Sequence, residues 1–546
     1  MDFINLTKNI VITALFLLGA LSCKQNSEKN IIGVVSSATP EASKVGEQIF
    51  LKGGNAIDVA VAVSFALGVT EPAMSGLGGG TQVLLSLNNG KPFAINGSTL
   101  SPANTPTNIG DTLTYHRRST IPSSVKVLDY LWRTYGSGKV SWAELLDPAI
   151  KLAENGFTVG EFRAKVYKQY ENELLESNFN TSFFLMEGKR IPVEGEILKQ
   201  PVLANTLKRL AKFGANDFYI GDIAKDIAKD MQKHNGYITL KDLHDFPEPN
   251  EVAALISSYK EMNVFSQPPP CGGWTVLLAL NVMEQLSKEH KLNNTDITEA
   301  LYLAHNDRDL DPITDLVHYD SIVNRKLSKD YTELLLKNNS VTNKQKQNKE
   351  SGETTHFSVV DSYGNVIAVT SSINAYFGSL STSTTLGFLY NTYMDDFIFE
   401  KPDHPFAIRP NAMAYSSMAP TIVQHDGKNV LVIGSPGSER IISSVAQITA
   451  KWIENNDINK LINDSRIHVS KNNMYLEDQK DYKSIDKYIL DKFDLQIKHA
   501  NKNLVITKGL NAYYGGIHAI AKENEKWVGV ADPRRDGKSI EVKINN

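Results

Sequence analysis

The chain has 546 residues, of which 41% are hydrophobic and 22% are charged, and its formal net charge is −4. This composition is that of an ordinary globular protein with a large core, and it excludes a disordered chain or a polybasic nucleic-acid binder. The two cysteines, Cys23 and Cys271, exclude a disulfide framework.

The N-terminal residues predict export. The apolar run 10–21 follows Lys8 and ends at Ser22 and Cys23. It is too short to span a bilayer but has the length of a signal-peptide core. Because it ends in a cysteine, it resembles a bacterial lipoprotein signal, and an ordinary secretory signal cleaved nearby is the alternative. We expect a signal peptide at 1–22, a polar tether at 23–31 and a lipid on Cys23. That lipid would anchor the protein to a bacterial membrane, in the periplasm or on the outer surface.

Helix and strand signals alternate in the first part of the folded chain. Residues 33–38 predict a short strand, and Thr39-Pro40-Glu41 predicts a helix start that is closed by Gly53-Gly54. Residues 55–69 are rich in alanine and valine on all sides, which predicts a buried helix. The glycine-rich segment 75–80 precedes a predicted strand at 81–87. It lacks the lysine of a phosphate-binding loop, so it predicts close backbone packing.

The middle of the chain, about 125–340, is dominated by helical periodicity. The clearest predicted helices are 142–155, 205–212 and 274–286, the last after the stiff turn 268–273. Residues 337–353 are polar except for one valine, so they cannot bury a core and predict a mobile boundary. This boundary ends at Thr354.

Strands predominate after the boundary. Residues 357–361 and 366–371 alternate around Tyr363-Gly364-Asn365, which predicts a hairpin. The remaining predicted elements are strands at 420–423 and 429–433, helices at 441–454 and 485–493, and a hairpin near 516–531.

Thr354 combines two features of a self-activating nucleophile: it follows a polar segment and it begins a strand. A hydroxyl is a poor nucleophile without a base. If the bond between Glu353 and Thr354 is cut, Thr354 gains an α-amine with a pKa of roughly 7.7–8.0, so nucleophile and base lie in one residue. A lone threonine at a strand start usually reflects only strand propensity. The surrounding sequence therefore decides the interpretation.

That surrounding sequence resembles the γ-glutamyltranspeptidase family of N-terminal nucleophile hydrolases. The signature comprises Thr354-Thr355-His356, Ser358, Gly364-Asn365, Thr370 and Asn374. Further matching segments follow in order, at 33–46, 53–63, 71–80, 268–273, 394–397, 416–423, 434–441 and 531–537. The resemblance implies an α+β fold, the four-layer αββα sandwich, without metal or organic cofactor. It also implies self-cleavage into a large subunit, 32–353, and a small subunit, 354–546, that form one globular unit.

The resemblance also implies roles for the residues around the nucleophile. Thr354 would attack the carbonyl of Glu353 during maturation and an amide carbonyl during catalysis. Gly437 and Ser438 match the glycine pair that forms the oxyanion hole of the family, with serine in place of the second glycine. Ser372 matches a second threonine whose hydroxyl supports the nucleophile.

Substrate recognition is where the chain departs from the family. Asn374, Tyr393 and Asp396 match the Asn, Gln and Asp that hold the α-amine of a γ-glutamyl group in glutathione-processing members. Two serines that hold the α-carboxylate match Ser416 and Ser417, but the arginine of that site is matched by Ser98. A serine does not replace a bidentate arginine contact. Arg117, Arg118 and Arg409 are the candidates for the missing charge.

We expect an exported, self-processing enzyme that cleaves γ-glutamyl or related amide bonds, such as that of glutathione, and hydrolyses or transfers the acyl group. Its partner would be a small amide or peptide substrate rather than nucleic acid. The alternatives are an oxamate- or cephalosporin-acylase-like hydrolase and an inactive, lipid-anchored binding protein. Residues 307–311 imitate a calcium loop but are rejected, because Pro312 and His318 occupy its glycine and glutamate positions. We expect a structural role for His356 and an idle, partly buried thiol at Cys271.

Overall fold

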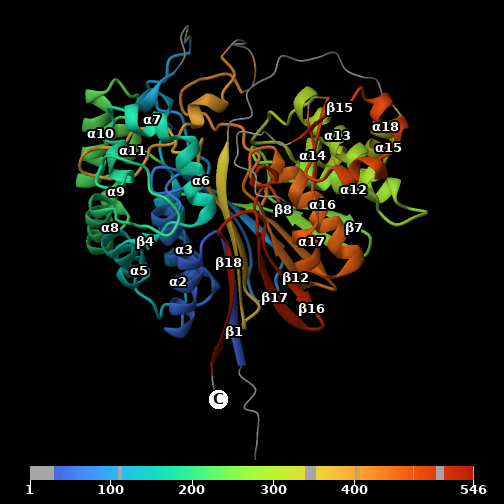
Figure 1. Ribbon diagram of the computed structural model, residues 1–546, viewed down its shortest axis with the longest axis horizontal. Coiled ribbons are helices and arrows are strands. Elements are labelled where there is room, and N and C mark those ends of the chain that lie inside the picture. Colours follow the sequence, from blue (N-terminus) through green and yellow to red (C-terminus); the bar gives the residue numbers. More distant parts are fainter. Residues whose placement is uncertain are drawn as a thin grey trace, which may run out of the picture.

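The computed structural model describes residues 30–107, 113–337, 352–399, 404, 406–470, 472–499 and 510–544. The predicted signal peptide, Cys23 and most of the polar segment before Thr354 lie outside these ranges. The described elements form four layers, with two central sheets between two sets of helices (Figure 1). This arrangement is the predicted αββα sandwich. Within the described ranges, no helix has the length and apolar character needed to cross a bilayer.

The first sheet contains seven antiparallel strands, and it includes the predicted hairpin around Gly364. In spatial order they are β18 (Lys538–Ile544), β1 (Asn30–Ser37), β9 (Glu353–Asp361), β10 (Val366–Asn374), β2 (Gly80–Ser86), β3 (Phe93–Asn96) and β6 (Asn250–Ala253). β9 lies in the interior of the sheet, between β1 and β10, so its backbone is held from both sides.

The second sheet has six strands. In spatial order they are β17 (Lys526–Ala531), β16 (His518–Glu523), β12 (Lys428–Ile433), β11 (Thr421–His425), β8 (Met262–Ser266) and β7 (Leu255–Tyr259). The prediction of a mostly helical middle segment missed β6, β7 and β8. β6 and β7 are edge strands whose side chains are largely exposed or half-buried, so the apolar alternation that signals a strand is weak there.

One helical layer covers the first sheet. Its helices are α2 (Pro40–Leu51), α3 (Ala56–Thr70), α4 (Ser124–Tyr135), α5 (Trp142–Asn155), α6 (Glu161–Gln169), α7 (Glu171–Glu176), α8 (Pro201–Phe213), α9 (Asn216–Tyr219), α10 (Asp222–Lys233) and α11 (Leu240–His244). As predicted, α3 is buried on all sides, because it lies between the sheet and the helices α2, α4 and α5. Asn55 caps it by accepting hydrogen bonds from two backbone amides of its first turn.

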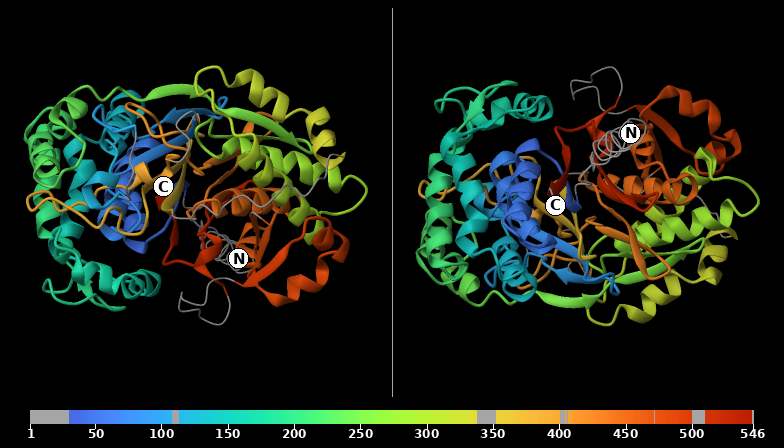
Figure 2. Two further views of the ribbon diagram at one scale, coloured as in Figure 1. Left: turned by 90° about the horizontal axis from the view of Figure 1, so that it is seen from above. Right: turned by 90° about the horizontal axis from the view of Figure 1, so that it is seen from below.

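The other helical layer covers the second sheet, so the two layers flank the sheets from opposite sides (Figure 2). It contains α12 (Gly273–Leu286), α13 (Asn294–Leu310), α14 (Asp320–Lys326), α15 (Lys329–Lys337), α16 (Arg440–Asn455), α17 (Ile458–Asn463) and α18 (Lys487–Lys492). Two small sheets complete the fold, β4 (Phe157–Thr158) with β5 (Ile197–Leu198), and β13 (Ile467–Ser470) with β14 (Asn473–Leu476) and β15 (Gln496–His499).

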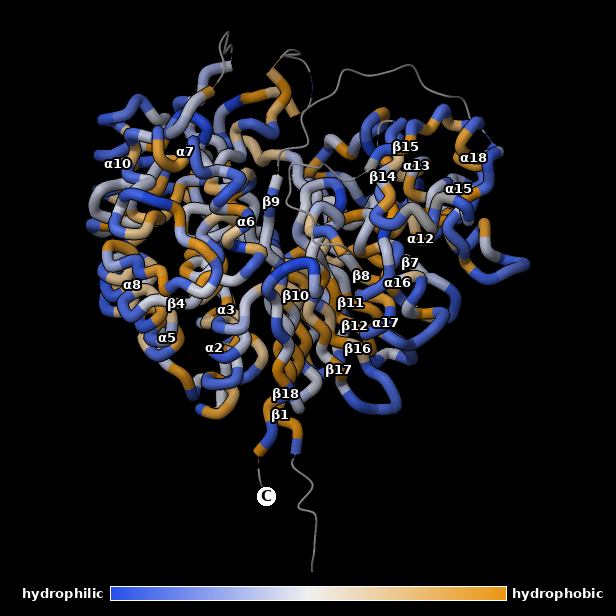
Figure 3. Tube along the Cα trace, viewed as in Figure 1, coloured by the Kyte–Doolittle hydropathy of each residue, from blue (hydrophilic) through white to orange (hydrophobic). Residues whose placement is uncertain are grey.

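An apolar interface joins the two sheets. Val34, Leu84, Val360, Val366 and Ala368 of the first sheet belong to one buried cluster with Phe265, Ile422, Val432 and Ile520 of the second. The hydropathy tube shows the same apolar strands at the centre of the molecule (Figure 3). Both sheets combine strands from before and after residue 353, so a cut there would leave two segments that share every major core.

The glycine-rich segment 75–80 packs backbone against backbone, as predicted. A Cβ added to Gly79 would lie 2.2 Å from the carbonyl oxygen of Ser372, and one added to Gly78 would lie 2.1 Å from that of Leu389. Only glycine permits this approach. It brings the start of β2 against the end of β10, where Ser372 lies.

Replacement of Gly79 tests this close approach. We expect Gly79→Ala to lower the free energy of unfolding by about 1–3 kcal/mol, because the added methyl group must displace the backbone of Ser372. Urea denaturation of the variant and wild type measures the difference. Gly138→Asn is the control, because Gly138 has a left-handed φ of 71° that asparagine tolerates, with no atom within 4 Å of the added Cβ. Equal losses in both variants would contradict the packing role of Gly79.

Candidate active site

Thr354 is the second residue of β9 and is only 4% exposed. The pairing of β9 with β10 is regular up to Thr355 and Ser371, and then skips, so that Glu353 pairs with Asn374. Two residues of β10, Ser372 and Ile373, therefore face the single residue Thr354. Such a bulge redirects a side chain toward the neighbouring strand. Here it places Ser372 beside the bond between Glu353 and Thr354.

The Ser372 hydroxyl contacts the carbonyl group of that bond directly. It donates a hydrogen bond of 2.5 Å to the carbonyl oxygen of Glu353. Its oxygen accepts a bond of 2.8 Å from the backbone N–H of Asn374. Because the hydroxyl has one proton, that proton is committed to the Glu353 carbonyl and draws electron density away from its carbon.

Two arginines hold the side chain of Glu353. One carboxylate oxygen lies 3.0 Å from Nη2 of Arg440, and the other lies 2.7 Å from Nη2 of Arg535. All three side chains are at least nine-tenths buried. Nη1 of Arg535 also donates a bond of 3.4 Å to the carbonyl oxygen of Thr354. The residues on both sides of the bond are therefore fixed in place.

Arg440 and Arg535 form what we call the arginine clamp on Glu353, and a second buried carboxylate lies near it. Glu71 accepts a bond of 2.6 Å from the hydroxyl of Thr355. Burial raises the pKa of the Glu71 carboxyl above its usual range, while the charge of Arg535 opposes the rise. The Coulombic pull of Glu353 contributes to raising the pKa of Arg535, against its burial, so this guanidinium stays charged.

Sequence reasoning assigned no role to Arg440, Arg535 or Glu71. All three lie inside segments that carried the family resemblance, 434–441, 531–537 and 71–80. The available signal was the presence of charged residues within apolar or glycine-rich motifs. Such residues are expected to be buried, and a buried charge is rarely found without a partner.

The structure brings together two of the predicted amine ligands. The side-chain amide of Asn374 donates bonds of 3.1 Å to Asp396 and 3.1 Å to the carbonyl oxygen of Thr392. Burial raises the pKa of the Asp396 carboxyl well above its usual range, and the bond from Asn374 opposes the rise. Asn374 has a left-handed φ of 73°, which turns the chain away from the sheet directly after β10.

Gly437 and Ser438 lie in the turn before α16. Gly437 has φ 118° and Ser438 has φ 53°, so the serine adopts the left-handed backbone that favours glycine. This backbone conformation is consistent with the preference for glycine that the resemblance implies at this position, and the serine adopts it nonetheless. A Cβ added to Gly352 would lie 3.3 Å from Cβ and Oγ of Ser438 and 3.3 Å from Oδ1 of Asn374. The segment before the bond thus runs between Ser438 and Asn374.

Ser416 and Ser417 form a second group with Arg308 of α13. Nη2 of Arg308 donates a bond of 2.8 Å to the carbonyl oxygen of Ser416 and one of 3.3 Å to the hydroxyl of Ser417. Its guanidinium lies over the ring of Tyr415, 4.0 Å from the centroid. Arg308 belongs to the segment 307–311, which is helical, and it was not among the arginines that we expected here.

Tyr393 belongs to an apolar cluster that contains Cys271, Met394 and Met418. Burial raises the pKa of its hydroxyl well above the usual range, and this hydroxyl has no hydrogen-bond partner among the described residues. A tyrosine ring therefore fills part of the space in which the resemblance implies a polar glutamine.

Ser98 and the three arginines named from the sequence make other contacts. The Ser98 hydroxyl donates a bond of 2.8 Å to Asn96 and accepts one of 3.0 Å from Gln82. Nε of Arg117 donates to the Tyr237 hydroxyl at 2.9 Å. Arg118 is paired with Asp395, with Nε–Oδ distances of 2.9 and 3.2 Å, and Arg409 is exposed.

Two residues expected to be structural are deeply buried. Cys271 is fully buried, rather than partly as expected, and burial raises the pKa of its thiol to about 12. His356 lies between the hydroxyls of Thr370 and Ser358, at 2.9 and 3.2 Å, and burial lowers its pKa well below the usual range. The thiol is thus protonated and the imidazole neutral near pH 7.

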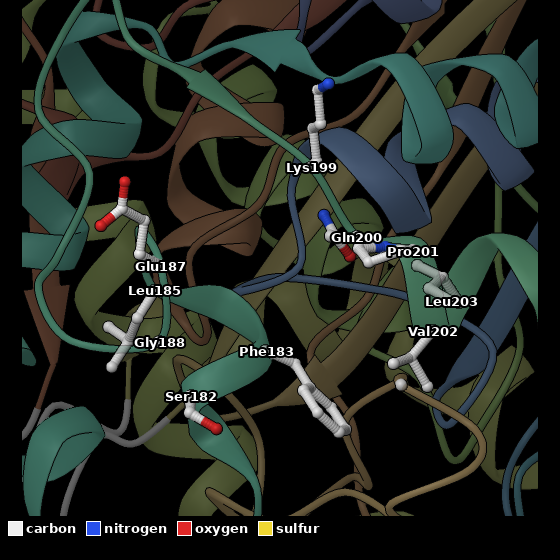
Figure 4. Close-up of a pocket in the computed structure, with 11 residues that line it drawn as sticks. Ser182, Phe183, Leu185, Glu187, Gly188, Lys199, Gln200, Pro201, Val202 and Leu203 are labelled. Carbon is white, nitrogen blue, oxygen red and sulfur yellow. The ribbon is translucent and has the colours of Figure 1, made fainter.

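A cavity of about 320 Å³ lies elsewhere, between the 3₁₀ helix η2 (Thr181–Phe184) and the start of α8 (Figure 4). Phe183, Leu185, Val202 and Leu203 contribute apolar walls, and Glu187 lies near its rim. None of the predicted site residues lines it. Around Thr354, by contrast, Gly352 and Glu353 of the same chain occupy the space, as expected of an uncut precursor.

Comparisons with known proteins agree with this geometry. The family model described as Gamma-glutamyltranspeptidase matches residues 42–542. The glutathione hydrolase proenzyme of Escherichia coli (strain K12) is 35% identical, with 77% of this chain and 78% of that protein aligned. That of Bacillus subtilis (strain 168) is 30% identical over 94% and 92% of the two chains. The crystal structure of cephalosporin acylase from Bacillus halodurans superposes with a TM-score of 0.79 at 22% identity, covering 95% and 98%, and it supports the fold alone.

The clamp on Glu353 predicts a large stability effect. In the Thr354→Ala background, where self-cleavage cannot interfere, we expect Glu353→Ala to lower the free energy of unfolding by about 3–5 kcal/mol. The reason is that it leaves two buried guanidiniums without their carboxylate. Urea denaturation measures the loss. The control Glu333→Ala removes one partner of an exposed pair with Lys337 and should cost less than about 1 kcal/mol. If both variants lose the same small amount, the clamp does not stabilise the precursor.

Proposed function

Because this chain belongs to the γ-glutamyltranspeptidase family, we propose that it is a proenzyme that cuts itself between Glu353 and Thr354 and then cleaves γ-glutamyl or related amide bonds with Thr354. One observation carries the proposal. The Ser372 hydroxyl lies 2.5 Å from the carbonyl oxygen of Glu353, next to a buried threonine at the start of an interior strand.

The cutting step follows from these contacts. The Thr354 oxygen adds to the carbonyl carbon of Glu353, and the carbonyl oxygen gains the negative charge. The Ser372 O–H already points at that oxygen, so it stabilises the charge without reorganisation. The carbon–nitrogen bond then breaks, the nitrogen takes the proton of the Thr354 hydroxyl, and an ester joins the two residues. Water hydrolyses the ester and releases Glu353 as a carboxylate and Thr354 with a free amine.

The cut also explains how the site opens. Before it, Gly352 and Glu353 lie against Ser438 and Asn374 and occupy the space around the nucleophile. After it, they form a free chain end that can leave. The departing end exposes Asn374 and Ser438, and it unpairs the clamp of Arg440 and Arg535.

In the catalytic cycle, the Thr354 amine accepts the proton of its own hydroxyl as the oxygen attacks the amide carbon of the substrate. The backbone N–H groups of Gly437 and Ser438 would receive the new oxyanion. The amide nitrogen takes a proton and leaves as an amine, and an acyl group remains on Thr354. Water or a second amine then attacks this ester, which gives hydrolysis or transfer.

For the substrate, a γ-glutamyl group is the first candidate. The half-buried Asp396, positioned by Asn374, suits an α-ammonium group, and Ser416 and Ser417 suit an α-carboxylate. Arg308 supplies a positive charge behind this serine pair. A second candidate is an acyl group without an α-carboxylate, which is favoured by the uncharged network around Ser98 and by the ring of Tyr393.

An inactive binding protein is the least supported alternative. A protein without chemistry has no need for a serine hydroxyl aimed at one particular peptide carbonyl. Export and the lipid anchor on Cys23 remain part of the proposal, and the cysteine lies outside the described residues.

Self-cleavage is tested on a denaturing gel. We expect wild type to give two bands and Thr354→Ala to give one, because the variant lacks the attacking oxygen. Ser372→Ala should slow processing by about 10²–10³, the usual effect of losing one oxyanion donor. Ser372→Thr keeps the hydroxyl and serves as the matched control with near-normal processing. A single band in wild type, after purification from an exported fraction, would refute the proposal.

The substrate class is tested with Ser98→Arg. We expect this variant to lower KM for a γ-glutamyl amide by roughly tenfold, about 1.4 kcal/mol, because it adds a cation where glutathione-processing members carry one. Steady-state rates with γ-glutamyl and simple acyl anilides measure the change, with Ser98→Gln as the uncharged control of similar reach. An unchanged KM in the arginine variant, with simple acyl anilides as the faster substrates of wild type, would favour the second candidate.

A further inference from the structure

Two histidines and one aspartate, His116, His234 and Asp230, converge outside the catalytic region. One ligand atom from each residue lies within 4.8 Å of the other two. Nε2 of His116 is 3.1 Å from Oδ2 of Asp230, and Nε2 of His234 is 3.7 Å from Oδ1 of the same carboxylate. We propose that these three residues bind a divalent transition-metal ion, with Zn²⁺ as the best match.

The local fold explains the convergence. Asp230 lies on α10 and His234 is the residue that ends it, so the i,i+4 spacing places both on one face. His116 comes from the 3₁₀ helix η1 (Tyr115–Arg118), more than one hundred residues earlier in the chain. α10 lies at the outer edge of the helical layer that covers the first sheet (Figure 1). The three ligands thus come from two separate elements, η1 and the C-terminal end of α10.

The distances suit a small tetrahedral ion. Zn²⁺ binds nitrogen and carboxylate oxygen at about 2.0–2.2 Å, so neighbouring ligand atoms of a tetrahedron lie roughly 3.3 Å apart. The two measured separations, 3.1 Å from Nε2 of His116 to Oδ2 of Asp230 and 3.7 Å from Nε2 of His234 to Oδ1, lie near that value, with each imidazole facing one oxygen of the carboxylate. Two imidazoles and one carboxylate are a ligand set that binds Zn²⁺ and its first-row neighbours, whereas Mg²⁺ and Ca²⁺ prefer oxygen alone.

The surroundings have the features of a built site. Tyr390 donates a bond of 3.0 Å from its hydroxyl to Oδ2 of Asp230, and so orients the carboxylate from behind, as partners of metal ligands commonly do. Phe179 packs against both imidazoles with centroid distances of 5.2 Å. His116 and Asp230 are buried, while the side chain of His234 is 22% exposed, which leaves a route for the ion and a water as fourth ligand.

The two ring nitrogens of His116 have different surroundings. Nε2, the ligand atom, lies within hydrogen-bond distance of Asp230, and Nδ1, on the other side of the ring, is buried without a hydrogen-bond partner in the part of the chain that the structure describes. The two imidazoles stack at 4.7 Å and share a single carboxylate. A cation bound between the ligand atoms would be attracted by the Asp230 carboxylate and by the lone pairs of both imidazoles.

The ion would connect this outer layer to the substrate region. η1 also carries Arg118, which pairs with Asp395, the neighbour of Asp396. Tyr390 lies on the segment that leads to Tyr393. Bound metal would therefore fix the position of η1 and of this segment against α10. Its role is structural, and the site is separate from the cofactor-free chemistry of Thr354.

Metal titration of the full-length, processed protein tests the proposal. After dialysis against a chelator and then chelator-free buffer, isothermal titration with ZnCl₂ should show one site per pair of large and small subunits, and MgCl₂ should show none. His234→Ala and Asp230→Asn should each weaken Zn²⁺ binding by at least about tenfold. His290→Ala is the matched control, because it removes an imidazole that faces Asp296 at 2.9 Å elsewhere in the fold, and it should leave binding unchanged.

A second measurement guards against misfolded variants. His234 is partly exposed, so His234→Ala should keep the circular dichroism spectrum and the two-band processing pattern of wild type. Co²⁺ added to the metal-free wild type should give the visible absorption of a tetrahedral site, and Co²⁺ added to this variant should not. The absence of a Zn²⁺ site in wild type, or equal binding by wild type and both ligand variants, would overturn the proposal.

Discussion

The contact on which the rest of the site depends is the hydrogen bond from Ser372 to the carbonyl oxygen of Glu353. A peptide bond resists attack because resonance with its nitrogen makes the carbonyl carbon less electrophilic. An O–H donor at 2.5 Å in a buried site is worth more than the same donor in water. The bulge in β10, the glycine packing at Gly79 and the arginine clamp on Glu353 all serve to hold these two groups at that distance.

The bond between Glu353 and Thr354 lies apart from most of the proposed recognition residues. It lies at the start of β9, opposite the end of β10, where neighbouring strands and two buried arginines leave little freedom. Apart from Asn374, the proposed recognition residues come from loops and turns, namely the segment around Asp396, the serine pair and the network around Ser98. Loops tolerate substitution more readily than interior strands do. The same fold can therefore keep its self-cleavage while the acyl group that it accepts changes.

The continuous chain fills the space beside Thr354. Gly352 lies close to Ser438 and Asn374, two residues that we propose for the substrate site. Both sheets combine strands from before and after the proposed cut, and the apolar cluster between the sheets does not include the bond between Glu353 and Thr354. A cut at this bond would therefore leave the fold intact.

Local sequence signals determined much of this molecule. The start of α2, the buried character of α3 and the hairpin of β9 and β10 follow from residue types over short spans, and the number and order of the matching sequence segments identified the family and its four layers. Sequence could not give the clamp of Arg440 and Arg535, the contact of Arg308 with the serine pair or the convergence of His116 with α10. Each of these joins residues far apart in the chain, and the energy of a buried charge or ligand depends on which partner the fold brings to it. Thus the sequence by itself determined the family and the architecture and singled out Thr354 as the proposed nucleophile, and only the tertiary structure decided which charges surround the bond between Glu353 and Thr354, because burial and pairing are properties of the folded chain.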